Sequence, residues 1–157
     1  MDRQHSLLIA ELTRLLTGKG AHASFDDAVK DLPENLRGVV PDNMPYSIWQ
    51  LVEHIRIAQW DMLQFSKEVK YETLNWPDDY WPKEHAPKND ATWKASIQQI
   101  EEDLKAFVAI INDKDLYTKL AHGNGQTLLR EALQIADHNA YHTAEIIVIR
   151  RMLKAWK

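Results

Sequence analysis

Cysteine is absent from this 157-residue chain. Without a thiol, the protein can form no disulfide bond, thiolate metal site or cysteine nucleophile. Any sulfur nucleophile in a reaction of this protein must therefore arrive as a second substrate. Because the absence of cysteine is compatible with the reducing cytosol, we expect a cytoplasmic protein.

Several other features are also missing. No apolar run approaches the roughly 20 residues that span a bilayer, and the N-terminal segment lacks an apolar stretch followed by a small-residue cleavage site. We therefore expect neither a membrane span nor a signal peptide. The net charge is −4 and the two signs are interspersed, so we do not expect nucleic acid as a partner. The length predicts a single domain over residues 1–157.

Apolar residues recur at helical spacing in four segments, whereas no segment alternates as a strand does. The first predicted helix ends at Gly18. The second begins after Ser47, which forms a capping box with Gln50. The third begins near Asn89, and the fourth begins after Gly125 and continues to near the C-terminus. This pattern predicts an all-α fold, a four-helix bundle with two long connections.

The two long connections differ in composition. Residues 24–38 predict a short helix that ends at Pro33, because proline interrupts a helix. Residues 75–90 are rich in proline and aromatic side chains, including the run WPDDYWP. We expect this second connection to seal one end of the bundle, although closure over a cavity is the alternative.

Two of the seven histidines, His138 and His142, are four residues apart in the last predicted helix. That spacing places their imidazoles on one face of the helix, with Cβ atoms ~5–6 Å apart. Glu131 and Glu145 lie on the same face, one on either side of the pair. The spacing alone leaves two interpretations open: metal ligands, or buried histidines hydrogen-bonded to their neighbours.

A third histidine, His54, lies beside Ile55 of the apolar face of the second helix. If the second and fourth helices are neighbours, all three imidazoles can point into one cavity. Three nitrogen ligands leave coordination positions for water or substrate, as in catalytic zinc sites. Zinc is the divalent metal we expect, while nickel and ferrous iron also accept imidazole ligands.

Four acidic residues lie near these histidines, namely Glu53, Asp61, Glu131 and Glu145. A carboxylate there can orient a ligand imidazole or act as a general base, and Glu145 is the candidate catalytic residue. Each is equally consistent with a solvated carboxylate on a helix. Tyr141 is one residue before the second histidine of the pair and is turned away from a metal, so we expect it to have a packing role.

The motif of residues 47–55, SIWQLVEHI, together with QTLLRE at 126–131 and DHNAYH at 137–142, resembles the DinB-like (YfiT-like) family of bacterial proteins. That family is distinct from the DNA polymerase of the same name. The resemblance covers almost the entire chain. It implies a four-helix bundle whose divalent metal is bound by His54, His138 and His142.

The same resemblance indicates what the protein does. Relatives include transferases and isomerases that use a low-molecular-weight thiol, and homodimers are common among them. Where relatives often have Gly-Gln, this chain has Ala144-Glu145. From the reactions and the dimers of its relatives, the resemblance implies a small-molecule substrate and a homodimer for this chain.

Two functional hypotheses follow from these observations. The first is a metal-dependent enzyme, either a thiol transferase or a hydrolase. The second is a non-catalytic helical module for binding or dimerisation, whose histidines are structural. An open coordination position favours the enzyme, and a closed site or no metal favours the module.

Overall fold

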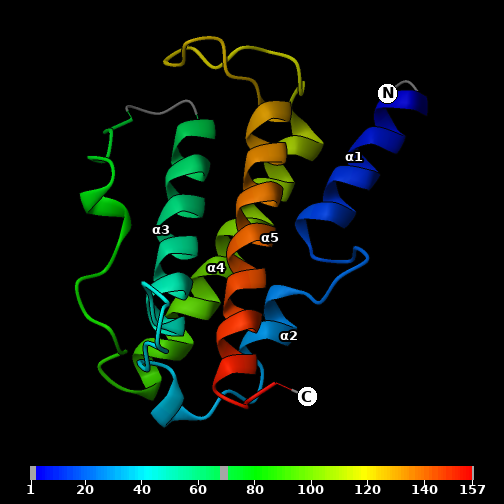
Figure 1. Ribbon diagram of the computed structural model, residues 1–157. Coiled ribbons are helices and arrows are strands. Elements are labelled where there is room, and N and C mark those ends of the chain that lie inside the picture. Colours follow the sequence, from blue (N-terminus) through cyan, green and yellow to red (C-terminus); the bar gives the residue numbers. More distant parts are fainter. Residues whose placement is uncertain (1–2, 68–70, 157) are drawn as a thin grey trace.

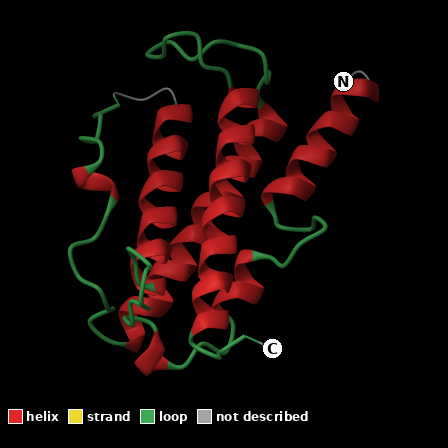
Figure 2. Cartoon of the chain, in the orientation of Figure 1, coloured by secondary structure: helices red, strands yellow, loops and turns green. Residues whose placement is uncertain are grey.

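The computed structural model describes residues 3–67 and 71–156, and these residues form an all-helical fold (Figures 1 and 2). They contain no β-strand; one isolated bridge pairs Lys119 with Thr127. The α-helices and 3₁₀ helices are, in chain order, α1 (Arg3–Leu16), α2 (Phe25–Val29), η1 (Glu34–Leu36), α3 (Ile48–Ser66), η2 (Asp78–Tyr80), α4 (Asp90–Asp113) and α5 (Leu128–Met152). The predicted all-α class is confirmed.

The starts of the long helices follow local capping chemistry. The Ser47 side chain accepts a hydrogen bond from the Gln50 backbone N–H, and the Gln50 side chain accepts one from the Ser47 N–H. This reciprocal pair confirms the predicted capping box. Thr127 caps α5 in a similar way by accepting from the Arg130 N–H. Because a local side-chain cap defines the start of each of these two helices, nearby residues alone determine where the helices that carry the histidines begin.

The segment around α2 differs from the prediction. The helix ends at Val29 rather than continuing to Pro33. Asp31 has φ 53°, in the left-handed region, which is incompatible with a continuing helix. The buried Arg150 of α5 then donates hydrogen bonds to the carbonyl oxygens of Ala28 and Lys30, both at 2.8 Å. The helix therefore ends before Pro33, and a guanidinium distant in sequence binds carbonyl oxygens at its carboxyl end.

Helices α3, α4 and α5 lie side by side, while α1 packs against α4 and α5 at an angle (Figure 1). The chain runs in opposite directions along α3 and α5, so the first half of α3 lies beside the second half of α5. This arrangement brings His54 to the level of the histidine pair. In the part of the chain that the structure describes, no helix combines the length and the hydropathy needed to cross a lipid bilayer.

Two apolar clusters form the core, one at each end of the helices. Phe107 and Ile135 belong to the first, and Ile55 and Ile146 belong to the second. On α5 the histidine pair falls between Ile135 and Ile146, at the boundary of the two clusters. A polar layer continues there, because Gln59 donates to the Ile100 carbonyl and accepts from the Asn139 amide. The polar groups of this layer satisfy one another within an otherwise apolar interior.

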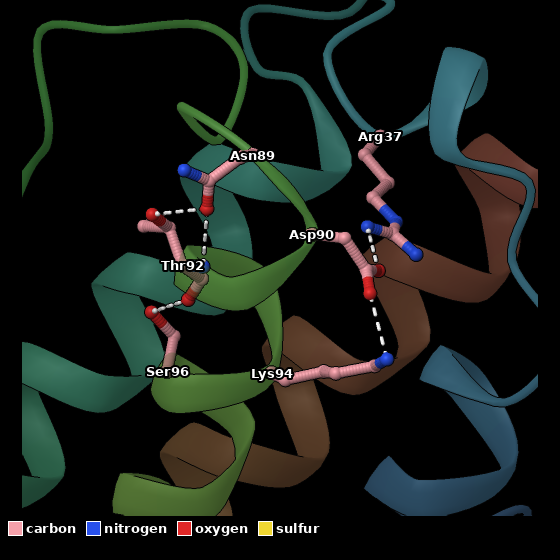
Figure 3. A network of polar contacts seen from close by, with 6 residues as sticks. All are labelled: Arg37, Asn89, Asp90, Thr92, Lys94 and Ser96. Carbon is pink, nitrogen blue, oxygen red and sulfur yellow. Dashed lines mark hydrogen bonds and ion pairs between the residues drawn. The ribbon is translucent and has the colours of Figure 1, made fainter.

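The beginning of α4 is fixed by a network of polar contacts (Figure 3). Asn89 accepts hydrogen bonds from the Thr92 backbone N–H and hydroxyl, at 2.9 and 3.0 Å. Asp90 forms ion pairs with the buried Arg37 at 2.9 Å and with Lys94 at 2.7 Å. The loop that precedes α3 is thereby tied to the first turn of α4.

Replacing Asn89 with alanine is expected to lower the free energy of unfolding by about 1 kcal/mol, because the first turn of α4 loses its side-chain cap. Urea unfolding followed by circular dichroism measures this loss. The exposed Gln98→Ala, on the same helix, is the control and should change stability by less than about 0.5 kcal/mol. Equal stability of the Asn89 variant and the wild type would refute the capping role.

Candidate metal centre

Three histidines from two helices meet in the interior. His54 comes from α3, and His138 and His142 come from α5. One ring nitrogen from each lies within 4.8 Å of one from each of the others. His54 is 2% exposed and His142 is 8% exposed, so the cluster is largely shielded from water. The structure thus brings together the three histidines that the sequence singled out, as a group that could hold a metal ion.

The hydrogen bonds around His54 define which of its nitrogens is free. Its Nδ1 donates to the Tyr80 backbone carbonyl at 2.9 Å. The Trp81 ring lies face to face with the imidazole, with centroids 3.9 Å apart and an angle of 4° between the planes. Because a carbonyl can only accept, Nδ1 carries the proton and Nε2 keeps its lone pair. That lone pair is the one a metal requires.

His142 is oriented by a carboxylate of its own helix. Its Nδ1 lies 2.7 Å from Glu145 Oε2, one turn further along α5. With Nδ1–H donating to this carboxylate, the other ring nitrogen is left as a donor for a metal. A carboxylate behind a ligating imidazole fixes the ring and raises its basicity. The structure therefore places Glu145 behind His142 as a positioning group for the imidazole.

The spacing of the nitrogens suits a single ion. His54 Nε2 and His138 Nε2 are 3.1 Å apart. Two nitrogens bound to one metal at ~2.0–2.1 Å are separated by roughly 2.8–3.4 Å at octahedral to tetrahedral angles. Without a metal, one of these nitrogens must donate a proton to the other. The donor set, the tautomers and this distance all fit a divalent cation that accepts imidazole.

Burial keeps the three imidazoles neutral. It lowers the pKa of His138 and of His142 to about 4, and the neighbouring imidazoles add to the effect. Burial also lowers the pKa of His54. Desolvation raises the pKa of Glu145. Neutral imidazoles are the form that binds metal, so the site is ready for an ion across the physiological pH range.

In the metal-free protein, His138 and His142 are expected to contribute a loss of stability as the pH falls from about 6.5 to about 4. In this window the unfolded chain protonates His138 and His142, whose folded-state pKa is lower, so it binds more protons than the folded chain does. Urea unfolding at several pH values, with a chelator present, measures the slope. His138→Asn should reduce the slope. An equal slope in His138→Asn and in the wild type would contradict the expectation.

The other three acidic candidates lie outside the histidine group. Asp61 accepts hydrogen bonds from the hydroxyls of Tyr71 and Tyr80, at 2.7 and 2.6 Å. Glu53 forms an ion pair with Arg56 at 2.8 Å on its own helix. Glu131 is 7% exposed, and burial raises the pKa of its carboxyl. Asp61 therefore binds the connection that follows α3 through two tyrosine hydroxyls, and Glu53 is paired with Arg56 on its own helix.

The WPDDYWP connection lies at the histidines rather than only at a bundle end. Tyr80 and Trp81 both contact His54, as described above, and the exposed Trp76 has its ring centroid 6.5 Å from that of His54. The expectation that this segment seals an end is corrected by these contacts. Tyr141 also differs from expectation, since it is 63% exposed and borders His142 with ring centroids 4.9 Å apart. No periodic pattern in the sequence indicated either placement.

A separate cavity of about 400 Å³ lies between α1, α4 and α5. Apolar residues such as Leu104, Val108 and Ala140 line most of it. Its α5 residues lie on a different side of the helix from the histidine pair. The cavity is therefore separate from the histidine group.

Comparison with known proteins identifies the family of this chain. Residues 19–146 match the family model of the DinB superfamily. No curated protein and no solved structure matches the chain. The matched region includes all three histidines, the connection that contacts them and most of the all-helical fold. The chain belongs to the DinB superfamily.

Proposed function

We propose that this protein is a metal-dependent enzyme in which His54, His138 and His142 bind one divalent metal, with zinc expected and nickel or iron as alternatives. The observation that supports this most is the orientation of the imidazoles. Separate acceptors engage Nδ1 of His54 and of His142, so their other nitrogens keep their lone pairs within the group. A purely structural cluster has no need for lone pairs that converge.

The proposed reaction is transfer of a low-molecular-weight thiol to an electrophilic substrate, with hydrolysis as the second possibility. The chemistry that a divalent metal supplies here is activation of a small thiol or of water as a nucleophile. Three protein ligands leave room for that nucleophile. The absence of cysteine requires the sulfur to come from a co-substrate. Membership of the DinB superfamily supports a metal-binding protein.

The protein's own residues contribute orientation and proton handling. The Tyr80 carbonyl and the Trp81 ring hold His54 in one tautomer and one plane. Glu145 orients His142 through a hydrogen bond to Nδ1. It is also the acidic residue that the sequence indicated as the candidate catalytic residue. Its proposed role is to position His142. Because the carboxylate lies on the Nδ1 side of the ring, away from the metal, proton transfer from a metal-bound nucleophile to Glu145 would require a bridging water.

The proposal is tested by loading the full-length, tag-free chain with cobalt(II) as a spectroscopic substitute and titrating it with ethanethiol. An open metal site is expected to give a saturable thiolate-to-cobalt absorption band, which His142→Ala abolishes. Thiol-dependent coupling to chlorodinitrobenzene should follow the same variants. Tight cobalt binding without a thiol band would indicate a closed, structural site and would favour the non-catalytic module.

Several other expectations from the sequence and the resemblance remain predictions. They are the four-helix-bundle class, the single domain over residues 1–157, the cytoplasmic location, the small-molecule substrate and the homodimer. Residues 1–2 and 157 of that domain lie outside the described part of the chain. Size-exclusion chromatography with light scattering checks the homodimer directly.

A further inference from the structure

Trp76 is a large apolar side chain that the fold leaves 71% exposed, yet its surroundings are ordered. Asn75 donates to Asp79 Oδ2 from its backbone N–H at 2.8 Å and from its side-chain amide at 3.0 Å. The Tyr80 ring packs edge-on against the indole, with centroids 5.2 Å apart. An exposed tryptophan on a turn held in this way is not an incidental feature of a mobile loop.

The turn is also attached to the candidate metal centre. Tyr80 uses its hydroxyl to bind Asp61 and its carbonyl to bind His54. The same residue therefore fixes both the Trp76 turn and one of the three histidines. Trp76 and the candidate metal centre consequently have a defined position relative to each other.

Because Trp76 is 71% exposed and its ring centroid lies 6.5 Å from that of His54, indole surface is available beside the centre. Trp81 occupies the stacking face of His54, while Trp76 is tilted by 56° to that imidazole at 6.5 Å between centroids. Indole rings bind planar groups by offset stacking and bury a large apolar area. A cation is disfavoured there, because a divalent metal in the centre would repel it.

From these contacts we infer that Trp76 is the specificity-determining residue for an uncharged planar group, aromatic or conjugated, on the molecule that reaches the metal. This inference rests on the proposed function. The ligand class is accordingly a small molecule that presents a thiolate or a similar anion to the metal and stacks a planar group on Trp76. The two parts of the site act on different groups of the ligand: the metal binds the anion, and the indole selects its substituent.

The test compares phenylmethanethiol with ethanethiol on the cobalt-loaded full-length chain. In the wild type we expect phenylmethanethiol to bind about three- to tenfold more tightly, the range of an aromatic pair. Trp76→Ala should remove this preference and leave ethanethiol binding unchanged, whereas Trp76→Phe should retain part of it. Trp76→Leu, which preserves apolar cover without a π face, should behave like the alanine variant and covers the case in which alanine prevents folding. Trp60→Ala, a tryptophan of α3 that is 38% exposed, is the matched control and should keep the full preference.

The outcomes separate this inference from the proposed function. An unchanged preference in Trp76→Ala and Trp76→Leu, with ethanethiol still bound, overturns the role of Trp76 alone. Loss of binding of both thiols to the same extent in these variants also overturns it, because the effect would then be on the metal centre. Failure of the wild type to bind cobalt or ethanethiol overturns the proposed function and this inference with it.

Discussion

Replacing His54 with alanine is expected to weaken binding of a divalent metal by more than about 100-fold. Loss of a group that only orients a ligand already costs 10–100-fold in affinity, and His54 would bind the ion directly. Its Nε2 lies 3.1 Å from that of His138, and its Nδ1 is held by the Tyr80 carbonyl. The alanine variant removes both the lone pair and the imidazole on which Trp81 stacks.

Competition titration with a chromophoric chelator measures this affinity for the wild type and for each histidine variant. His138→Ala and His142→Ala should lose affinity to a similar degree, since all three nitrogens belong to one group. His22→Ala is the control, because that histidine is exposed and lies in the connection before α2. If His54→Ala bound metal as tightly as the wild type, the site would belong to α5 alone and the three-histidine centre would be wrong.

The second large effect is expected at Glu145. Glu145→Ala should lower metal affinity by about 10–100-fold, because His142 loses the carboxylate 2.7 Å from its Nδ1. Glu145→Gln keeps an acceptor for that N–H and loses only the charge, so its affinity should fall less. The difference between the two variants separates the hydrogen bond from the charge.

Glu102→Ala, an exposed carboxylate of α4, is the matched control for this series. Isothermal titration with zinc gives the affinities, and the rate of thiol coupling at saturating metal gives a second readout. A loss of rate in Glu145→Gln without a loss of affinity would assign proton transfer to Glu145. Wild-type affinity and rate in Glu145→Ala would exclude both roles.

The helices that carry the site could be predicted because their signals are local. Ser47 and Gln50 identify the start of α3 by themselves, and the spacing of His138 and His142 places both on one face of α5. Placing His54 with them required one assumption, that α3 and α5 are neighbours. The structure confirms the resulting group, because the two helices pack together in opposite directions.

The connections could not be predicted in the same way, since their contacts depend on residues distant in sequence. The Tyr80 carbonyl reaches His54 across 26 positions of the chain. Arg150 binds the end of α2 from more than 100 positions away, where the helix ends before the Pro33 signal. No periodicity or motif encodes such pairs. The run WPDDYWP indicated aromatic packing, but only the fold places it against the histidines.

The metal content of the purified protein tests the three-histidine centre most directly. Elemental mass spectrometry is applied to chain produced without an affinity histidine tag, after dialysis and after incubation with zinc or nickel. About one equivalent of a divalent metal per chain is expected for the wild type, falling close to zero in His142→Ala. No bound metal in the wild type, even after incubation with both ions, would contradict the metal centre and leave His54, His138 and His142 as hydrogen-bonded histidines in a helical core.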